Sequence, residues 1–172
     1  MKGIPLVVNN FNVYKQGHAL IGISGEVTLP DFENVTATVS GAGILGEFEE
    51  NVIGMFNSME QEIPFRILDD DIFSFMDPTE IVDLTLRASQ QITNKGTGEI
   101  DYRGMRVVVR GKQKKFVAGK VKQGEQMDAS VTLEVIYLLI EIDGVKKIEL
   151  DKLNFVYKVN GKDILAKVRK QF

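Results

Sequence analysis

The chain has 172 residues, of which 44% are hydrophobic and 26% are charged, and its formal net charge is -3 at pH 7. This length suits one domain with a sizeable core, no apolar run is long enough for a membrane-spanning helix, and the charge balance gives no reason to expect sequence-specific nucleic-acid binding. Because the chain has no cysteine and does not open with a basic segment followed by an apolar one, neither disulfides nor a secretory signal peptide nor a membrane anchor is predicted.

Charge is distributed unevenly along the chain. Residues 16–65 contain no Lys or Arg but eight carboxylates, whereas residues 95–172 contain 17 basic and 10 acidic side chains. The acidic residues of the first segment are Glu26, Asp31, Glu33, Glu47, Glu49, Glu50, Glu60 and Glu62. Two explanations remain open: unequal solvated surface, or an acidic face that meets the basic face of another copy.

Alternation of apolar and polar residues predicts strands in the first half of the chain. Strands are expected at 11–14, 34–40 and 58–68, with extended chain over 19–29 that ends at Pro30. Three aspartates, Asp69 to Asp71, then precede IFSFM, and carboxylates at a helix N-terminus favour helix formation. A short helix is therefore predicted there, ending at Asp77-Pro78.

The second half continues the pattern. Strands are predicted at 82–92, 99–110, 127–142, 145–150 and 154–159, with a hairpin turn at Asp143-Gly144, another turn at Asn160-Gly161 and a short helix within 162–170. The strand at 127–142 has an apolar middle, which indicates burial on both faces or a seam between subunits. The fold is thus predicted to be mainly β with one or two short helices, as an antiparallel β-barrel or two packed sheets.

Gly41, Gly43 and Gly46 match the G-x-G-x-x-G spacing of a dinucleotide site. The residues that follow are EFEENVIG, so carboxylates occupy the place of the pyrophosphate, and a P-loop would need Lys followed by Ser or Thr there. The segment is better explained as a long loop with Ile44 and Leu45 exposed, serving as a docking element or folding back on its own sheet.

No set of residues predicts catalysis, a metal site or a cofactor. His18 is the only histidine, and no G-x-S-x-G motif accompanies it. Asp69, Asp70 and Asp71 lack the alternation that directs carboxylates at one calcium ion. The run RGKQKKFVAGKVK at 110–122 is a solvated loop or a contact with an acidic protein surface; its basic residues are Arg110, Lys112, Lys114, Lys115, Lys120 and Lys122.

Several segments in this order resemble the major tail tube protein of contractile-tailed phages, a family that also supplies the tubes of phage-tail-like (R-type) bacteriocins. The similar segments are NNFNVYKQG (9–17), GEVTLPDF (25–32), the glycine segment, MFNSMEQEIPF (55–65) and LIEIDGVKKIELDKLNFVYKVNGKDIL (139–165).

The resemblance implies one tail tube domain over 1–172, with a long protruding loop at about 41–54, and a structural rather than enzymatic role. Subunits would form stacked hexameric rings whose sheets join into a larger inner β-barrel, the wall of a hollow conduit. The expected partners are copies of the chain, the sheath protein, the baseplate and the tail terminator, in a virion tail or bacteriocin particle assembled in the bacterial cytoplasm.

The loop is expected to mediate self-assembly by reaching an adjacent ring or subunit. Its residues are Gly41, Ala42, Gly43, Ile44, Leu45, Gly46, Glu47, Glu49 and Glu50. Two other functions remain open: the tube protein of a related secretion system, and a monomeric β-barrel that binds a small apolar ligand.

Overall fold

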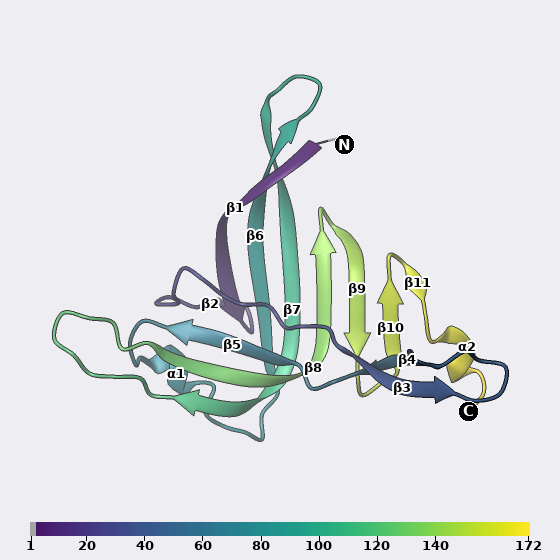
Figure 1. Cartoon of the computed structure of the whole chain (residues 1–172). Helices are drawn as coiled ribbons and strands as arrows, with labels where there is room; N and C mark the ends of the chain where they lie inside the picture. Colours follow the sequence, from purple (N-terminus) through teal and green to yellow (C-terminus); the bar gives the residue numbers. More distant parts are fainter. Residues whose placement is uncertain (1–2) are drawn as a thin grey trace.

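A computed structural model describes residues 3–172 and shows a mainly β chain with antiparallel sheets and two short helices (Figure 1). Nine strands form one sheet in the order β11-β10-β9-β8-β7-β6-β1-β2, with β5 paired to β8, and β3 and β4 form a separate hairpin. The elements are β1 (Gly3–Lys15), β2 (His18–Ala19), β3 (Asn34–Ser40), β4 (Glu47–Phe56), β5 (Glu60–Phe65), α1 (Asp70–Phe73), β6 (Val82–Asn94), β7 (Ile100–Val117), β8 (Ala129–Ile142), β9 (Val145–Asp151), β10 (Val156–Val159), β11 (Lys162–Asp163) and α2 (Ala166–Arg169).

The sequence predicts either an antiparallel β-barrel or two packed sheets, and the single chain does not form the closed barrel. The described sheet ends at β2 on one side and at β11 on the other, and these two strands do not pair with each other. Closure would require the two ends of the sheet to meet, and they lie on opposite sides of the molecule (Figure 1). The sheet is therefore open, and its edges remain available for pairing with another chain.

The long strands β7 and β8 bend where their pairing is irregular, after Arg110 and again after Gln113. Such bulges bend a strand and strengthen its twist. The first part of β8, Ala129–Glu134, lies on one side of the bend, where β8 has β7 as one neighbour and β5 as the other. In Figure 1 this portion of the sheet lies across a second portion, the upright sheet. The upright sheet consists of β1, β6, β9 and the remaining residues of β7 and β8. One continuous sheet thus supplies two layers.

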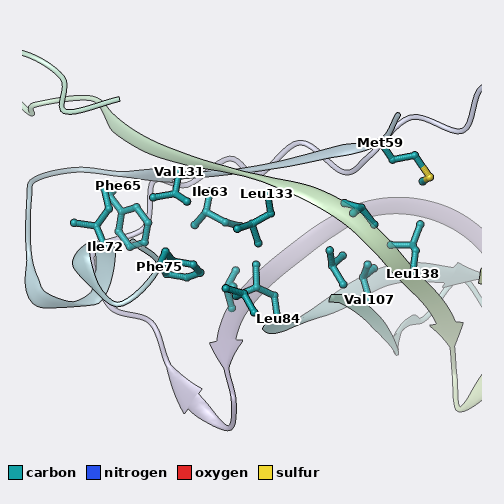
Figure 2. Packing of buried hydrophobic residues seen from close by; sticks show 14 of the residues in the cluster. Met59, Ile63, Phe65, Ile72, Phe75, Leu84, Val107, Val131, Leu133 and Leu138 are labelled. Carbon is teal, nitrogen blue, oxygen red and sulfur yellow. The ribbon is translucent and has the colours of Figure 1, made fainter. Parts of the chain in front are cut away.

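The hydrophobic core lies between these layers and is closed at one end by α1. Ile72 of α1 and the following Phe75 are fully buried, and the Phe75 ring meets Phe65 edge to face with centroids 6.0 Å apart. Figure 2 shows Ile63, Phe65, Val131 and Leu133 facing Leu84 and Val107 across the core. The largest fully buried side chains are Phe65, Phe75, Met59, Ile63, Ile72, Leu133, Leu138, Val107, Val131 and Val135.

Periodicity identified the strands of this sheet well. In β6, Val82, Leu84, Ala88 and Ile92 are buried, as the alternation predicts. The hairpin turn at Asp143-Gly144 is also confirmed: both residues have positive φ, 54° and 77°, which suits the tight turns that match strand twist. The turn at Asn160-Gly161 has the same form.

Several predicted boundaries are wrong. β1 begins at Gly3 rather than near Phe11, and residues 20–29 are irregular chain apart from a single bridge between Ile23 and Phe65. Asp69 occupies the N-cap position of α1, but its side chain makes no capping hydrogen bond. The predicted C-terminal helix is reduced to the four residues of α2.

The predicted long loop at 41–54 is mostly strand. Residues 47–54 belong to β4, so only residues 41–46 form the turn. Most side chains of β4 are exposed, so its sequence shows no clear alternation of apolar and polar residues. The basic run is likewise not a loop throughout, since residues 110–117 are the last part of β7.

Gly111 marks the bend, and a side chain there has no room. A Cβ on Gly111 would lie 2.3 Å from the backbone carbonyl oxygen of Glu134, and backbone cannot move aside as a flexible side chain can. We expect Gly111→Ala to lower the free energy of unfolding by about 3 kcal/mol, the upper end of the usual cost of overpacking. Urea denaturation of the dispersed subunit measures this cost. Gly104→Ala is the matched control, because nothing lies within 4 Å of its Cβ position; equal losses in the two variants would contradict the prediction.

Candidate assembly surfaces

The β3–β4 hairpin projects from the molecule on the side of β10 and α2 (Figure 1). Val39 lies opposite Phe48 and Ala37 lies opposite Glu50, so these residues share one face of the ribbon. Thr38 opposite Glu49 and Ser40 opposite Glu47 form the other face. The hairpin therefore has one mixed face with apolar side chains and one strongly polar face.

The turn of the hairpin holds the predicted assembly residues Gly41 to Gly46. Gly41, Gly43 and Gly46 all have positive φ, between 87° and 136°, which allows the chain to reverse within six residues. Leu45 is fully exposed, and Ile44 is 37% exposed. The turn thus does not fold back on the main sheet, and it presents an apolar tip to solvent.

The base of the hairpin is fixed to the main sheet. The ring of Phe56 packs between Phe32 and Tyr157, with centroid distances of 5.9 and 5.1 Å. Gly54 lies so close to Leu165 that a Cβ would be 2.8 Å from its methyl groups. The direction in which the hairpin projects is therefore set by packing.

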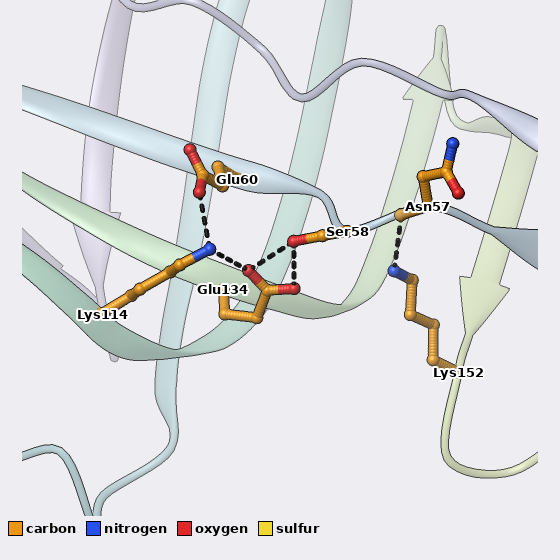
Figure 3. A network of polar contacts seen from close by, with 6 residues as sticks. All are labelled: Asn57, Ser58, Glu60, Lys114, Glu134 and Lys152. Carbon is orange, nitrogen blue, oxygen red and sulfur yellow. Dashed lines mark hydrogen bonds and ion pairs between the residues drawn. The ribbon is translucent and has the colours of Figure 1, made fainter.

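A second contact holds the segment between the hairpin and β5. Lys152 Nζ donates to the carbonyl oxygen of Asn57 at 3.1 Å (Figure 3). The Asn57 N–H donates to the carbonyl oxygen of Glu33 at 2.8 Å. Burial lowers the pKa of Lys152, an effect that the nearby Glu134 carboxylate partly opposes.

Next to this contact is a polar network formed by Ser58, which directly precedes β5, with Glu60 of β5, Lys114 of β7 and Glu134 of β8 (Figure 3). Ser58 Oγ lies 2.6 and 2.9 Å from the two Glu134 carboxylate oxygens, and Lys114 Nζ lies 2.7 Å from Glu60 and 3.2 Å from Glu134. Burial raises the pKa of Glu134, but the hydrogen bonds from Ser58 and Lys114 outweigh it, so the net pKa lies below the ordinary value of 4.5. The hydrogen bond to Glu60, followed by that to Glu134, raises the pKa of Lys114.

These shifts predict how Ser58→Ala depends on pH. A carboxylate whose pKa is lowered by folding stabilises the fold above its unfolded-state pKa and loses that contribution as pH falls through its folded-state pKa. We expect Ser58→Ala to reduce the free energy of unfolding at neutral pH by less than about 1 kcal/mol, because the network is partly exposed. The reduction shrinks well below pH 4.5, where Glu134 is protonated. Urea denaturation at both pH values measures it, and a loss that grows on acidification would contradict the assignment. Ser40→Ala, an exposed change on β3, is the control.

The basic run at 110–122 does not form one free basic surface. Arg110 pairs with Asp83, Lys114 with Glu60 and Glu134, Lys120 with Glu125 and Asp128, and Lys122 with Glu125. Among the ion pairs of residues 3–172, none includes Lys112 or Lys115. These two lysines of β7 are thus the members of the run that have charge to offer a partner.

The two ends of the sheet expose backbone edges. β1 pairs with β6 along nearly its whole length, but on its other side only Tyr14 and Lys15 are paired, with β2. At the far end, β10 is covered by the two-residue strand β11 alone. Four apolar side chains of β1 are 45–60% exposed, namely Ile4, Leu6, Val7 and Val8. This edge strand is not predicted in the sequence analysis, although the apolar run at residues 4–8 indicates it.

The described residues contain no cluster of side chains suited to a metal ion. His18 is exposed on β2, and no group of three or more His, Asp or Glu side chains within 3–172 could hold a metal ion. Over the same range, no helix is long and apolar enough to cross a membrane. The surfaces that stand out are the hairpin and the sheet edges.

Comparison with known proteins gives a consistent result. The family model described as phage tail tube protein FII matches residues 5–172. The tail tube protein of Escherichia phage P2 is 28% identical over 170 residues, which cover 97% of this chain and 96% of that protein. The major tail tube protein of Serratia phage KSP20 is 25% identical over 162 residues, covering 94% of this chain and 91% of that protein.

Proposed function

The chain belongs to the phage tail tube protein FII family, and from this we propose that its copies join edge to edge into hexameric rings that stack as the inner tube of a contractile tail. It is a structural tail tube protein and not an enzyme. The single observation that supports ring formation is the open sheet, whose two uncovered edges lie on opposite sides of the molecule (Figure 1). An edge that pairs with the opposite edge of the next copy repeats head to tail and leaves no strand exposed when the ring closes.

One face of the upright sheet suits a water-filled bore. The residues of β6 that point away from the core are polar: Asp83, Thr85, Arg87, Ser89 and Gln91. Two ion pairs form on this face within the chain, Arg106 with Glu141 and Arg110 with Asp83. Arg87 on the same face takes part in no ion pair among residues 3–172. We assign this face to the inside of the tube, where a continuous barrel of sheets from all subunits surrounds the conduit.

The remaining surfaces are assigned to contacts with other proteins. The β3–β4 hairpin, with the glycine turn and its carboxylates, contacts a neighbouring copy. Lys112 and Lys115 of β7 are offered to an acidic partner, either the sheath protein or the next ring. The whole described chain acts as one tail tube domain, and the baseplate and tail terminator are the expected contacts at the two ends of the tube.

The alternative of a monomeric ligand-binding barrel is contradicted by the open sheet and by the family. A barrel of that kind needs a closed interior, whereas the space between the two layers here is filled by core side chains (Figure 2).

Negative-stain electron microscopy of the concentrated protein tests the proposal. Hollow rods or stacked rings are expected, with purified tail baseplates added as seeds in a parallel sample. Dispersed small particles in both samples would overturn the proposal, because a tube subunit must assemble at least from its natural template. Single rings that never stack would support edge-to-edge pairing within a ring but overturn the proposal that rings stack into a tube.

A further inference from the structure

An apolar groove lies on the core-facing side of the upright sheet, close to the free edge of β1. Its volume is about 160 Å³. The groove is lined by residues of three strands and of the irregular segment between β2 and β3. They are Val8 and Phe11 of β1, Leu86 and Ala88 of β6, Met105 of β7, and Val27 and Leu29 of the irregular segment. Val8 is 52% exposed, so this end of the groove is open to solvent. The groove is continuous with the hydrophobic core, because three of its lining residues, Phe11, Leu86 and Met105, also pack against the buried core residues.

The rim of the groove has an arginine without an acidic partner. Arg103 Nε donates to Gln90 Oε1 at 2.7 Å, and Gln90 Nε2 in turn lies 3.4 Å from the Met105 sulfur. No ion pair found among residues 3–172 includes Arg103. Its charge is thus available to a carboxylate that arrives with an apolar segment.

The β3–β4 hairpin has the matching features. Phe48, 46% exposed, shares a face with Val39 and Glu50, and the tip adds the fully exposed Leu45. A two-stranded ribbon by itself is marginally stable in water, so burial of its apolar face against a partner stabilises it. The face therefore offers apolar side chains for the groove and a carboxylate for its rim.

The positions of the two features place them together in a ring. The hairpin base packs on Tyr157 of β10, which lies opposite the buried Leu150, so the hairpin sits on the core-facing side of the sheet. β10 is near one end of the sheet and β1 is near the other (Figure 1). When copies join edge to edge, the hairpin of one copy projects over the core-facing side of the next copy at β1, where the groove opens.

We propose that the β3–β4 hairpin of each subunit docks in the groove at Val8, Phe11 and Met105 of the next subunit in the same ring. Phe48 and the tip residues Ile44 and Leu45 fill the groove, and Glu50 faces Arg103. This inference rests on the proposed edge-to-edge ring and names the surface that receives the hairpin.

Cysteine cross-linking tests this directly, because the chain has no cysteine of its own. In the double variant Val8→Cys with Leu45→Cys, oxidation of assembled rods is expected to produce a ladder of covalent multimers that ends at the number of copies in a ring. Leu45→Cys alone gives dimers at most. The matched control pairs Leu45→Cys with Val121→Cys. Val121 is 91% exposed, lies in the segment between β7 and β8 and does not line the groove, so this pair is expected to form no ladder.

The outcomes separate this inference from the tube itself. Rods that form normally while the Val8–Leu45 cysteine pair gives no more multimers than the control would overturn the docking site and leave the tube intact. A ladder that extends without limit would place the contact between rings and overturn the assignment to one ring. Absence of rods from the unmodified chain, even with baseplate seeds, would overturn both.

A charge exchange provides the second test. Arg103→Glu and Glu50→Arg are each expected to reduce the yield of rods, because each places like charges together at the rim. The double variant restores the yield by re-forming the pair with reversed signs. If the double variant assembles no better than the weaker single variant, Glu50 does not face Arg103.

Discussion

Rods are expected to disappear when Leu45 and Phe48 are both replaced by aspartate, while the isolated subunit keeps its fold. Leu45 is fully exposed and Phe48 is 46% exposed, so neither side chain contributes much to the core of its own chain. Exposed substitutions of this kind usually change the free energy of unfolding by no more than about 0.5 kcal/mol. In a ring, by contrast, the two aspartates of each subunit would be buried in the apolar groove of the next subunit without a partner for their charge. This cost would recur at every contact between subunits.

Two measurements on the same sample check this result. Electron microscopy or sedimentation reports the fraction of protein in rods, and urea denaturation of the dispersed subunit reports its folding. Val121→Asp is the control, since Val121 is an apolar residue that is 91% exposed and lies in the segment between β7 and β8. If the variant with both aspartates forms rods at the same protein concentration as the unmodified chain, the hairpin is not an assembly element.

Leu133→Ala is expected to destabilise the dispersed subunit by about 2–5 kcal/mol, the range for large-to-small changes at fully buried sites. Leu133 lies on β8, has no exposed surface, and belongs to the cluster between the two layers (Figure 2). Loss of its side chain leaves a cavity beneath the bent strands, which limited relaxation of the sheet cannot fill.

Leu153→Ala makes the same chemical change at a residue that is 67% exposed, and it is expected to alter stability by no more than about 0.5 kcal/mol. Both variants are compared by urea denaturation at low protein concentration, because assembly would add its own stabilisation. Similar losses at the two sites would show that the core does not lie where the structure places it.

Local pattern was sufficient for most of the sheet. The alternation at 82–92 predicted β6 because one of its faces is buried and the other is polar, and the Asp143-Gly144 and Asn160-Gly161 pairs predicted turns because few residues other than glycine and asparagine adopt positive φ readily. The pattern failed where burial is not one-sided. Most side chains of β4 are exposed, and only its end at Val52, Gly54 and Phe56 is half-buried, so the pattern predicts a loop there. The exposed first half of β1 escapes the pattern for a similar reason.

The assembly residues were identified only in part. The tip residues Ile44 and Leu45 stood out because exposed apolar residues beside glycine are unusual, and the structure places them at the end of a fixed hairpin. The basic run stood out for its composition, yet four of its six charges are paired with carboxylates that lie far away in the sequence or in the following turn. Composition reports charge, whereas pairing depends on which strands become neighbours.

A mainly β chain without cysteine chemistry follows from the sequence alone, and the order of its segments indicates the tail tube family to which the chain belongs. These properties depend on residue type and short-range periodicity, which a sequence states directly. Three features emerge only in the folded chain: the sheet stays open, the hairpin leaves on the side of β10, and a groove with Arg103 at its rim lies near β1 at the other end of the sheet. Those features arise from strand order, bulges and packing between residues far apart in the chain, and no local pattern encodes them.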